Sequence, residues 1–327
     1  MRSAPELRAA LRPTRAGAIA LLVATPWILW AALRTLGLER GHPLVALVAF
    51  SPYAAALSPL PVVVALLLRR RLVAAVAAVA AVALLAAMAP RALPGPQRAE
   101  AGAGGRPLVV MSANLLVGGA DATAVVRLVR EHDVDVLSLQ ELTPDALRRL
   151  DAAGVGDLLP GRAVRSDPRW SGIGLLARAP LRAVPPRRGG AATQLEAVLA
   201  PRDGPALRLV AVHPLPPVSR ANTRAWQPAL RRLPGPRAGG TPRVLIGDFN
   251  ATLDHREMRR LLARGYVDAA DATGDGLRPT WPTTGRRLPL TIDHVLFPAP
   301  IRVRRVSLHT VRGSDHRALI AELVLPR

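Results

Sequence analysis

Long apolar runs are confined to the first 90 residues of the chain. The runs without Arg, Lys, Asp or Glu cover residues 16–33, 41–68 and 72–90. A helix needs about 20 apolar residues to cross the hydrocarbon core of a bilayer. The pattern therefore predicts a membrane anchor over residues 1–90 that contains three transmembrane helices. The predicted helices span residues 16–36, 44–67 and 72–90.

Prolines are expected to change the shape of the predicted helices, and the length of the apolar runs decides between transmembrane helices and the alternatives. Pro26 is expected to kink the first helix, and Pro52, Pro59 and Pro61 are expected to kink or shorten the second. Buried helices of a soluble domain are the alternative. A cleaved signal peptide is disfavoured, because the first apolar run is long and two further runs follow it.

Arginines in the short loops predict the orientation of the helices. One side of the membrane receives the N-terminal tail and the second loop, with Arg2, Arg8, Arg12, Arg15, Arg69, Arg70 and Arg71. The other side receives the first loop, with Arg34 and Arg40. The side with seven arginines is expected to be cytoplasmic. The protein is then a multi-pass protein of the plasma membrane, and everything after Pro90 is extracytoplasmic.

The composition changes after Pro90. Residues 91–106 are rich in Gly, Pro and Arg and predict a flexible linker. Residues 107–327 alternate short apolar runs with polar segments and are long enough for a single large core. The expected strands cover 107–111, 134–139, 173–177, 195–199, 207–212, 243–246, 291–297, 301–308 and 318–325. The expected helices cover 121–131, 145–150, 220–233 and 255–263.

Charge and cysteine content narrow the function classes. The 327 residues include 44 basic residues, all of them Arg, against 23 acidic ones, and the net charge is +21. This charge suits a nucleic-acid partner, but a coding bias that enriches Arg, Ala, Gly and Pro together is the favoured explanation. The chain has no cysteine, which excludes disulfides, thiolate zinc sites and a cysteine nucleophile.

Polar residues recur at the ends of the predicted strands. They are carboxylates, carboxamides and imidazoles, and side chains at strand ends of a layered α/β scaffold can converge on a cleft. Oxygen-rich ligands favour a hard divalent cation such as Mg²⁺. A cation together with His and Asp is what metal-assisted hydrolysis of a phosphoester needs.

The ordered set of these motifs resembles the endonuclease/exonuclease/phosphatase family, which includes DNase I-like nucleases. The motifs are Ser112-Ala113-Asn114, Gln140-Glu141, His213, Gly247-Asp248-Phe249-Asn250, Asp293-His294 and Ser314-Asp315-His316. The resemblance covers residues 107–327. It implies an α/β fold, a four-layer sandwich of two packed mixed β-sheets flanked by helices. It also implies a catalytic domain over 107–327 that uses Mg²⁺ or Mn²⁺.

The resemblance also implies a role for each motif residue. Glu141 resembles the principal metal ligand, with Asn114 near the same ion and Asp315 as a further carboxylate on the metal side. Asp248 and Asn250 resemble the pair that orients the attacking water and the phosphate. His316 resembles the catalytic histidine, polarised by Asp293, and His213 the histidine that contacts the phosphate. Water is expected to attack phosphorus directly.

Several neighbouring residues are expected to be structural. His132, His255, His294 and His309 belong to this group, and Trp281 is expected to pack in the core rather than face substrate. For Trp170, a place at the cleft rim and an ordinary structural role are equally favoured. No DNA-binding wedge is identified, and the candidate loops are 162–170 and 185–190.

Three functions remain open for the whole chain. Three spans before an exported domain resemble the teicoplanin-resistance-associated membrane proteins, which implies a lipid-linked phosphate or pyrophosphate as substrate. The alternatives are a surface nuclease that cuts extracellular DNA or RNA, and a catalytically silent domain that binds phosphorylated ligands. The membrane is an expected partner in each case, and the sequence identifies no protein partner.

Overall fold

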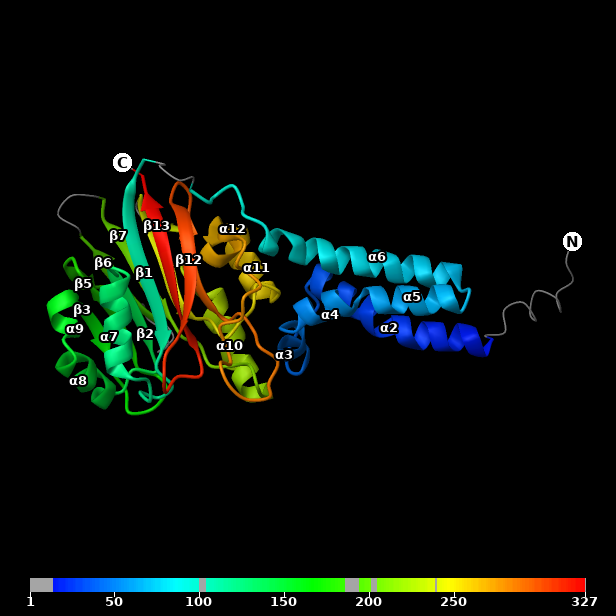
Figure 1. Cartoon of the computed structure of the whole chain (residues 1–327), viewed down its shortest axis with the longest axis horizontal. Coiled ribbons are helices and arrows are strands. Elements are labelled where there is room, and N and C mark those ends of the chain that lie inside the picture. The colour runs from blue at the N-terminus through cyan, green and yellow to red at the C-terminus, as the bar shows by residue number, and fades with distance from the viewer. Residues whose placement is uncertain (1–13, 100–103, 186–193, 201–204, 239, 327) are drawn as a thin grey trace, which may run out of the picture. The chain divides into compact units, whose positions relative to one another are not determined.

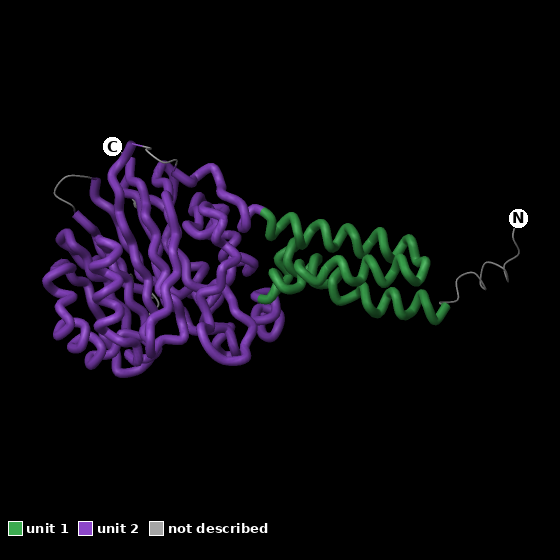
Figure 2. The backbone as a smooth tube through the Cα atoms, in the orientation of Figure 1, with its two compact units in different colours: residues 1–40, 50–89 green, residues 41–49, 90–327 purple. Residues whose placement is uncertain are grey.

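The computed structural model describes residues 14–99, 104–185, 194–200, 205–238 and 240–326, and it divides into two compact units (Figure 1, Figure 2). Unit 1 contains residues 1–40 and 50–89. Unit 2 contains residues 41–49 and 90–327. Arg2, Arg8 and Arg12, three of the arginines used to predict orientation, lie outside the described residues.

Unit 1 is helical. Its helices are α2 (Arg15–Leu36), α4 (Ser51–Leu57), α5 (Pro59–Leu67) and α6 (Arg71–Met88). The side chain of Thr14 accepts a hydrogen bond from Gly17 N and caps α2, and Gly37 ends this helix in a left-handed conformation with φ 63°. Both are the residue types that these cap positions favour.

Among the described residues, two helices rather than three are long and apolar enough to cross a membrane. They are Arg15–Leu36, with a mean hydropathy of 1.9, and Arg71–Ala92, with 2.7. The predicted helix over 44–67 is wrong as a continuous span, because it is divided into α3 (Leu44–Val48), α4 and α5. Pro52 and Pro59 lie in the first turns of α4 and α5. Proline has no N–H to continue a preceding helix, so each marks a new start.

Small side chains let the helices of unit 1 approach each other closely. Helix α5 contacts both α2 and α6, and Ala20, Ala65 and Ala74 form a buried cluster. The outward side chains are apolar as well: Leu22 is 75% exposed and Leu72 is 79% exposed. Small residues inside and apolar residues outside are typical of helices that pack in lipid.

Unit 2 contains two mixed β-sheets. In the described chain, the first sheet has the order β12-β13-β1-β2-β4-β3 and the second the order β10-β11-β9-β7-β6-β5, with β8 paired to β9. The strands of the first sheet are β1 (Arg106–Asn114), β2 (Val136–Gln140), β3 (Gly161–Arg165), β4 (Ile173–Ala177), β12 (Arg302–Thr310) and β13 (Arg317–Leu325). Those of the second are β5 (Leu181–Ala183), β6 (Gln194–Leu199), β7 (Leu207–Val212), β8 (Arg237–Ala238), β9 (Thr241–Asp248), β10 (Tyr266–Asp268) and β11 (Asp293–Pro298). β1 runs parallel to β2 and β7 parallel to β9, and the other pairs are antiparallel.

Alternating side chains place apolar residues on both faces of each sheet. On β1, Val110 belongs to the core between the two sheets, whereas Met111 belongs to the core under the helices. The outer face of the first sheet is covered by α7 (Ala122–Glu131), α8 (Pro144–Ala152) and α9 (Val155–Leu158). The outer face of the second is covered by α10 (Arg220–Arg231) and α11 (Arg256–Ala263). Two sheets between two helical layers confirm the predicted α/β sandwich.

The predicted linker is largely packed against unit 2. Ala99 N donates to Val303 O at 2.7 Å, and Gly95 N donates to the carbonyl of Ala272 in helix α12 (Ala269–Thr273) at 2.8 Å. β12 is an edge strand, and residues 97–99 pair with the backbone groups that an edge leaves open. The part of the linker that falls on residues 100–103 lies outside the described chain.

Candidate active site

Strand register brings the motif residues to one end of the sandwich. Asn114 ends β1 and pairs with Gln140, the last residue of the parallel strand β2. In the second sheet, Asp248 at the end of β9 pairs with Asp293 at the start of the antiparallel strand β11. Four segments that are distant in the sequence therefore place polar residues at the same end of the sandwich.

Two site residues have a backbone conformation that side-chain-bearing residues rarely adopt. Glu141 has φ 55° and Asn250 has φ 47°. Asn250 N donates to Asp248 Oδ1 at 2.7 Å, and Asn250 Nδ2 donates to Pro214 O at 2.9 Å. A left-handed glutamate is unusual, and such strain gathers at functional sites.

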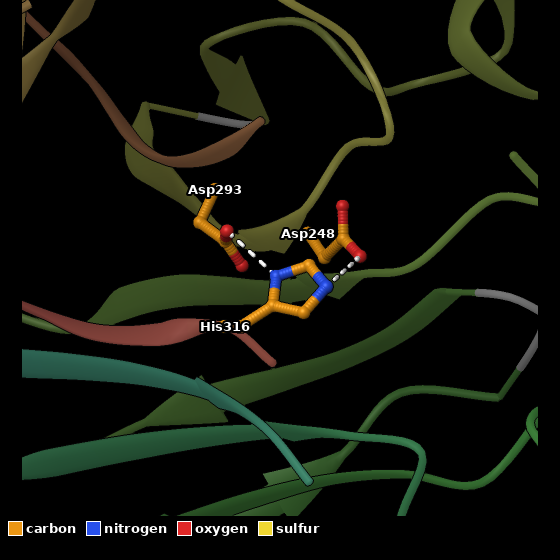
Figure 3. A group of neighbouring side chains, drawn as sticks. All are labelled: Asp248, Asp293 and His316. Carbon is orange, nitrogen blue, oxygen red and sulfur yellow. Dashed lines mark hydrogen bonds and ion pairs between the residues drawn. The ribbon is translucent and has the colours of Figure 1, made fainter. Parts of the chain in front are cut away.

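His316 lies between two carboxylates (Figure 3). Its Nδ1 is 2.9 Å from Asp293 Oδ2, and its Nε2 is 3.7 Å from Asp248 Oδ2. Thr280 Oγ1 accepts hydrogen bonds from the backbone N of Ile292 and of Asp293, so it fixes the start of β11. The Asp293–His316 pair that the sequence suggested is therefore present. Asp248 faces the other ring nitrogen of His316, and Thr280 fixes the backbone at Asp293.

Burial and neighbouring charges separate the pKa values of these groups. Burial by itself lowers the pKa of His316, but Asp293, Asp248 and Asp315 outweigh it and raise this pKa to about 10. Burial raises the pKa of Asp248 to about 7, with Asp293 adding to the rise and His316 opposing it. Burial, assisted by His316, lowers the pKa of His213 to about 4. At neutral pH His316 is an imidazolium and His213 is a neutral imidazole.

A second group of side chains lies beside this pair. Asn114 Nδ2 donates to Glu141 Oε1 at 3.2 Å and to Asp248 Oδ2 at 3.1 Å. His213 Nε2 lies 3.7 Å from the same two carboxylate oxygens. Asp315 Oδ1 is 3.9 Å from His316 Nε2. All eight residues that the sequence singled out therefore gather in one site.

The donor set fits a divalent cation. Four carboxylates converge there, and their mutual repulsion would be relieved by a positive ion. Asp315 Oδ1 is buried and has no hydrogen-bond partner in the structure, so it is an oxygen available to a ligand. Asp248, Asp293 and His316 also offer ligand atoms that lie within 4.8 Å of one another. Nδ1 of His316 is engaged by Asp293, which favours the Glu141 and Asp315 side for the ion.

The sequence did not assign all residues that contact the site. Trp281, expected in the core, donates from Nε1 to Asp315 Oδ2 at 2.8 Å, and its ring lies 6.3 Å from that of His316. Trp170 meets the ring of His213 edge-on at 6.2 Å. Gln140 instead turns inward and donates to Ser138. The sequence contains Thr280-Trp281-Pro282, but only the fold shows that Trp281 lies beside Asp315.

Comparison with known proteins shows the family and the fold of this chain. The Endonuclease/Exonuclease/phosphatase family model matches residues 111–316. No curated protein matches the chain. A solved endonuclease/exonuclease/phosphatase from Beutenbergia cavernae shares 17% identity over 67% of this chain and 72% of its own, with a TM-score of 0.50. A humanized D. rerio TDP2 shares 18% identity over 66% and 98%, with a TM-score of 0.51. Truncated Caenorhabditis elegans TDP2 shares 17% over 67% and 98%, with a TM-score of 0.51.

These structural similarities concern the fold, whereas the family match spans every motif from β1 to His316. The match covers more than half of the chain and includes all eight predicted site residues. The chain therefore belongs to the endonuclease/exonuclease/phosphatase family of phosphoester-cleaving hydrolases.

Proposed function

We propose that the protein is a membrane-anchored, divalent-metal-dependent phosphohydrolase that cleaves a lipid-linked phosphate or pyrophosphate. The observation that carries the proposal is His316 between Asp293 and Asp248, at 2.9 and 3.7 Å, beside the carboxylate of Glu141. Such a site has both a proton acceptor and positive groups that can stabilise a phosphate.

The side chains divide the chemistry between them. Asp248, whose pKa is raised to about 7, accepts a proton from the attacking water. Asn250 holds the Asp248 loop through its bond to Pro214 O. The imidazolium of His316, kept protonated by Asp293, donates from Nε2 to a phosphate oxygen. Neutral His213 can donate a hydrogen bond through one ring nitrogen only.

Glu141, with Asn114 and Asp315, would hold the cation, which we propose to be Mg²⁺ or Mn²⁺. When bound, the ion neutralises phosphate charge and stabilises the charge that develops in the transition state.

Exposed apolar side chains in the loops that follow site residues support a lipid substrate. Leu116 and Val117 follow Asn114, are 42% and 49% exposed, and bond through their backbone N–H to Asn114 and Glu141. Val218, in the loop after His213, is 69% exposed, and Leu288, in the loop after Trp281, is 52% exposed. Hydrocarbon next to the phosphate would cover these side chains, whereas a sugar-phosphate backbone would leave them in water.

The apolar helices support membrane anchorage. Helices α2 and α6 are long enough to span a bilayer, and α4 with α5 would return the chain between them. Arg70 bonds to Thr14, which places the second loop beside the start of α2. We propose that this end is cytoplasmic and that unit 2 is extracytoplasmic.

A nuclease is the second candidate. D. rerio TDP2, one of the proteins of similar fold, has been solved with a single-stranded DNA product. In this chain Arg287 lies 5.5 Å above the ring of Trp281, and an arginine on an aromatic ring can stack on bases. The residues after Pro90 carry 35 Arg and 21 acidic residues, which would also attract nucleic acid.

A substrate panel separates the candidates. The full chain in lipid nanodiscs is given a polyprenyl pyrophosphate, plasmid DNA or a soluble diester, each with Mg²⁺ and with EDTA. We expect metal-dependent release of inorganic phosphate from the lipid while the plasmid stays intact. In Val218→Ser with Leu288→Ser, KM for the lipid should rise by more than KM for the soluble diester.

Other outcomes contradict the proposal. Nicked or degraded plasmid without phosphate release from the lipid would establish the nuclease. Binding of the lipid without turnover of any substrate would establish the catalytically silent domain.

A further inference from the structure

The segment that follows the catalytic loop is completely buried. Residues 251–255 come directly after Asp248, Phe249 and Asn250, and each is at most 4% exposed. Three polar contacts hold this segment, and each comes from a different part of the chain. The segment next to the catalytic loop is therefore fixed to three other parts of the chain.

The first contact is a buried ion pair with the linker. Arg91 donates from Nη1 to Asp254 Oδ2 at 2.8 Å and from Nη2 to Asp254 Oδ1 at 3.1 Å. The two side chains are 7% and 0% exposed. Arg91 lies in a short 3₁₀ helix over Ala89–Ala92, directly after α6. A bidentate arginine–carboxylate pair fixes both distance and orientation.

The second contact comes from the chain between α2 and α4. The carbonyl of Val45, in α3, accepts from Nε2 of His255 at 3.0 Å, and Nδ1 of the same ring accepts from Thr252 N at 3.0 Å. Val45 is fully buried in the same apolar cluster as Phe249. One imidazole thus joins α3 to the turn that follows the catalytic loop.

The third contact comes from the residue after Asp293. His294 Nε2 lies 2.8 Å from Ala251 O, and its Nδ1 lies 2.8 Å from Asp268 Oδ2. Both side chains of this pair are 1% exposed. His294 therefore ties the segment to β11, which carries the partner of His316.

We infer that Arg91 and Val45 position the catalytic loop Asp248–Asn250, through Asp254 and His255. Residues 41–49 and 90–99 each follow unit 1 residues in the chain, and each stretch contains one residue that contacts the same five-residue segment. A chain restricted to residues 107–327 would lack both contacts. This inference rests on the proposed function only in that Asp248 is catalytic, whatever the phosphoester.

The test compares point variants of the full chain in nanodiscs. Asp254→Asn keeps the shape of the side chain and Arg91→Lys keeps the positive charge, but each loses the bidentate pair. His255→Gln should restore part of what His255→Leu loses, because an amide can donate and accept as the imidazole does. The matched control is Arg243→Lys, which breaks another buried pair, Arg243 with Glu196, at the far end of β9.

Two readouts decide the inference. Hydrogen exchange of the amides of residues 249–255 should accelerate at least tenfold in Arg91→Lys, Asp254→Asn and His255→Leu, and not in Arg243→Lys. On a soluble phosphodiester, kcat should fall about 10- to 100-fold with little change in KM, as misplacement of a reacting group predicts. Unchanged exchange in 249–255, or the same acceleration in Arg243→Lys, would overturn the inference even if the protein proves to act on nucleic acid.

Discussion

At the scale of single residues, the placement of His316 sets the protonation of the site. Asp293 contacts one ring nitrogen and Asp248 faces the other (Figure 3). The arrangement explains why one buried carboxylate can accept a proton near neutrality while the adjacent imidazole keeps its own. Two titratable groups with pKa values moved apart are typical of an acid and base pair.

This placement predicts the pH dependence of turnover. Asp248 must be deprotonated to accept a proton, and its pKa is raised to about 7, so kcat/KM should fall about tenfold per pH unit below that range. A bound cation would move this acidic limb to lower pH. His316 must stay protonated, and its pKa is raised to about 10, so activity should fall again above that pH.

Asp293→Asn provides the check on the alkaline side. Removing this negative charge lowers the pKa of His316, so the alkaline limb should move to lower pH by at least one unit. The measurement is a pH profile of kcat/KM on a soluble diester. An alkaline limb at the same pH in wild type and variant would contradict the assigned role of Asp293.

The sequence identified the charged and polar residues of the site, but it did not identify the residues that position them. The eight predicted side chains converge because each lies at a strand end or within two residues of one, and periodicity reveals the strands. Trp281 and Thr280 follow no strand pattern. They reach the site because Trp281 pairs with Leu290 across a loop and Thr280 O accepts a hydrogen bond from Arg317 N. His294 was expected to be structural, and its bonds to Asp268 and Ala251 agree with that expectation.

At the scale of elements, the long apolar and alternating segments were predictable and the short ones were not. Helix α7 begins after Asp121, whose side chain accepts from Ala124 N, at the expected cap. β5 and β10 have three residues each, too few to show a period. The middle apolar segment was predicted as one helix, kinked or shortened by its prolines, because hydropathy does not show where a proline ends one helix and starts the next.

The proposed orientation of α2 and α6 predicts which introduced cysteines can be labelled. The chain has no cysteine, so single substitutions report without background. A membrane-impermeant maleimide should label Ala152→Cys, exposed in α8, in intact spheroplasts. Ser3→Cys should react only after permeabilisation. The reverse pattern would show that unit 2 is cytoplasmic.

At the scale of the whole molecule, the mean hydrophobic content describes neither unit. The 50% hydrophobic residues combine an Ala-, Leu- and Val-rich helical unit with an ordinary α/β sandwich. Seven arginines near the apolar helices would act as orientation signals in the proposed topology, and the remaining positive charge suits an anionic membrane surface as well as nucleic acid. The charge alone therefore does not decide the substrate.

The central claim is that the end-of-sandwich site hydrolyses a membrane-borne phosphate with a divalent cation. Its most direct test is inorganic phosphate release from a polyprenyl pyrophosphate in vesicles, by the full chain and by Asp248→Asn, Glu141→Gln and His316→Gln. We predict Mg²⁺-dependent release that falls about 10²- to 10⁴-fold in each variant, at an unchanged melting temperature. Near wild-type release by His316→Gln, or release that persists in EDTA, would contradict the account.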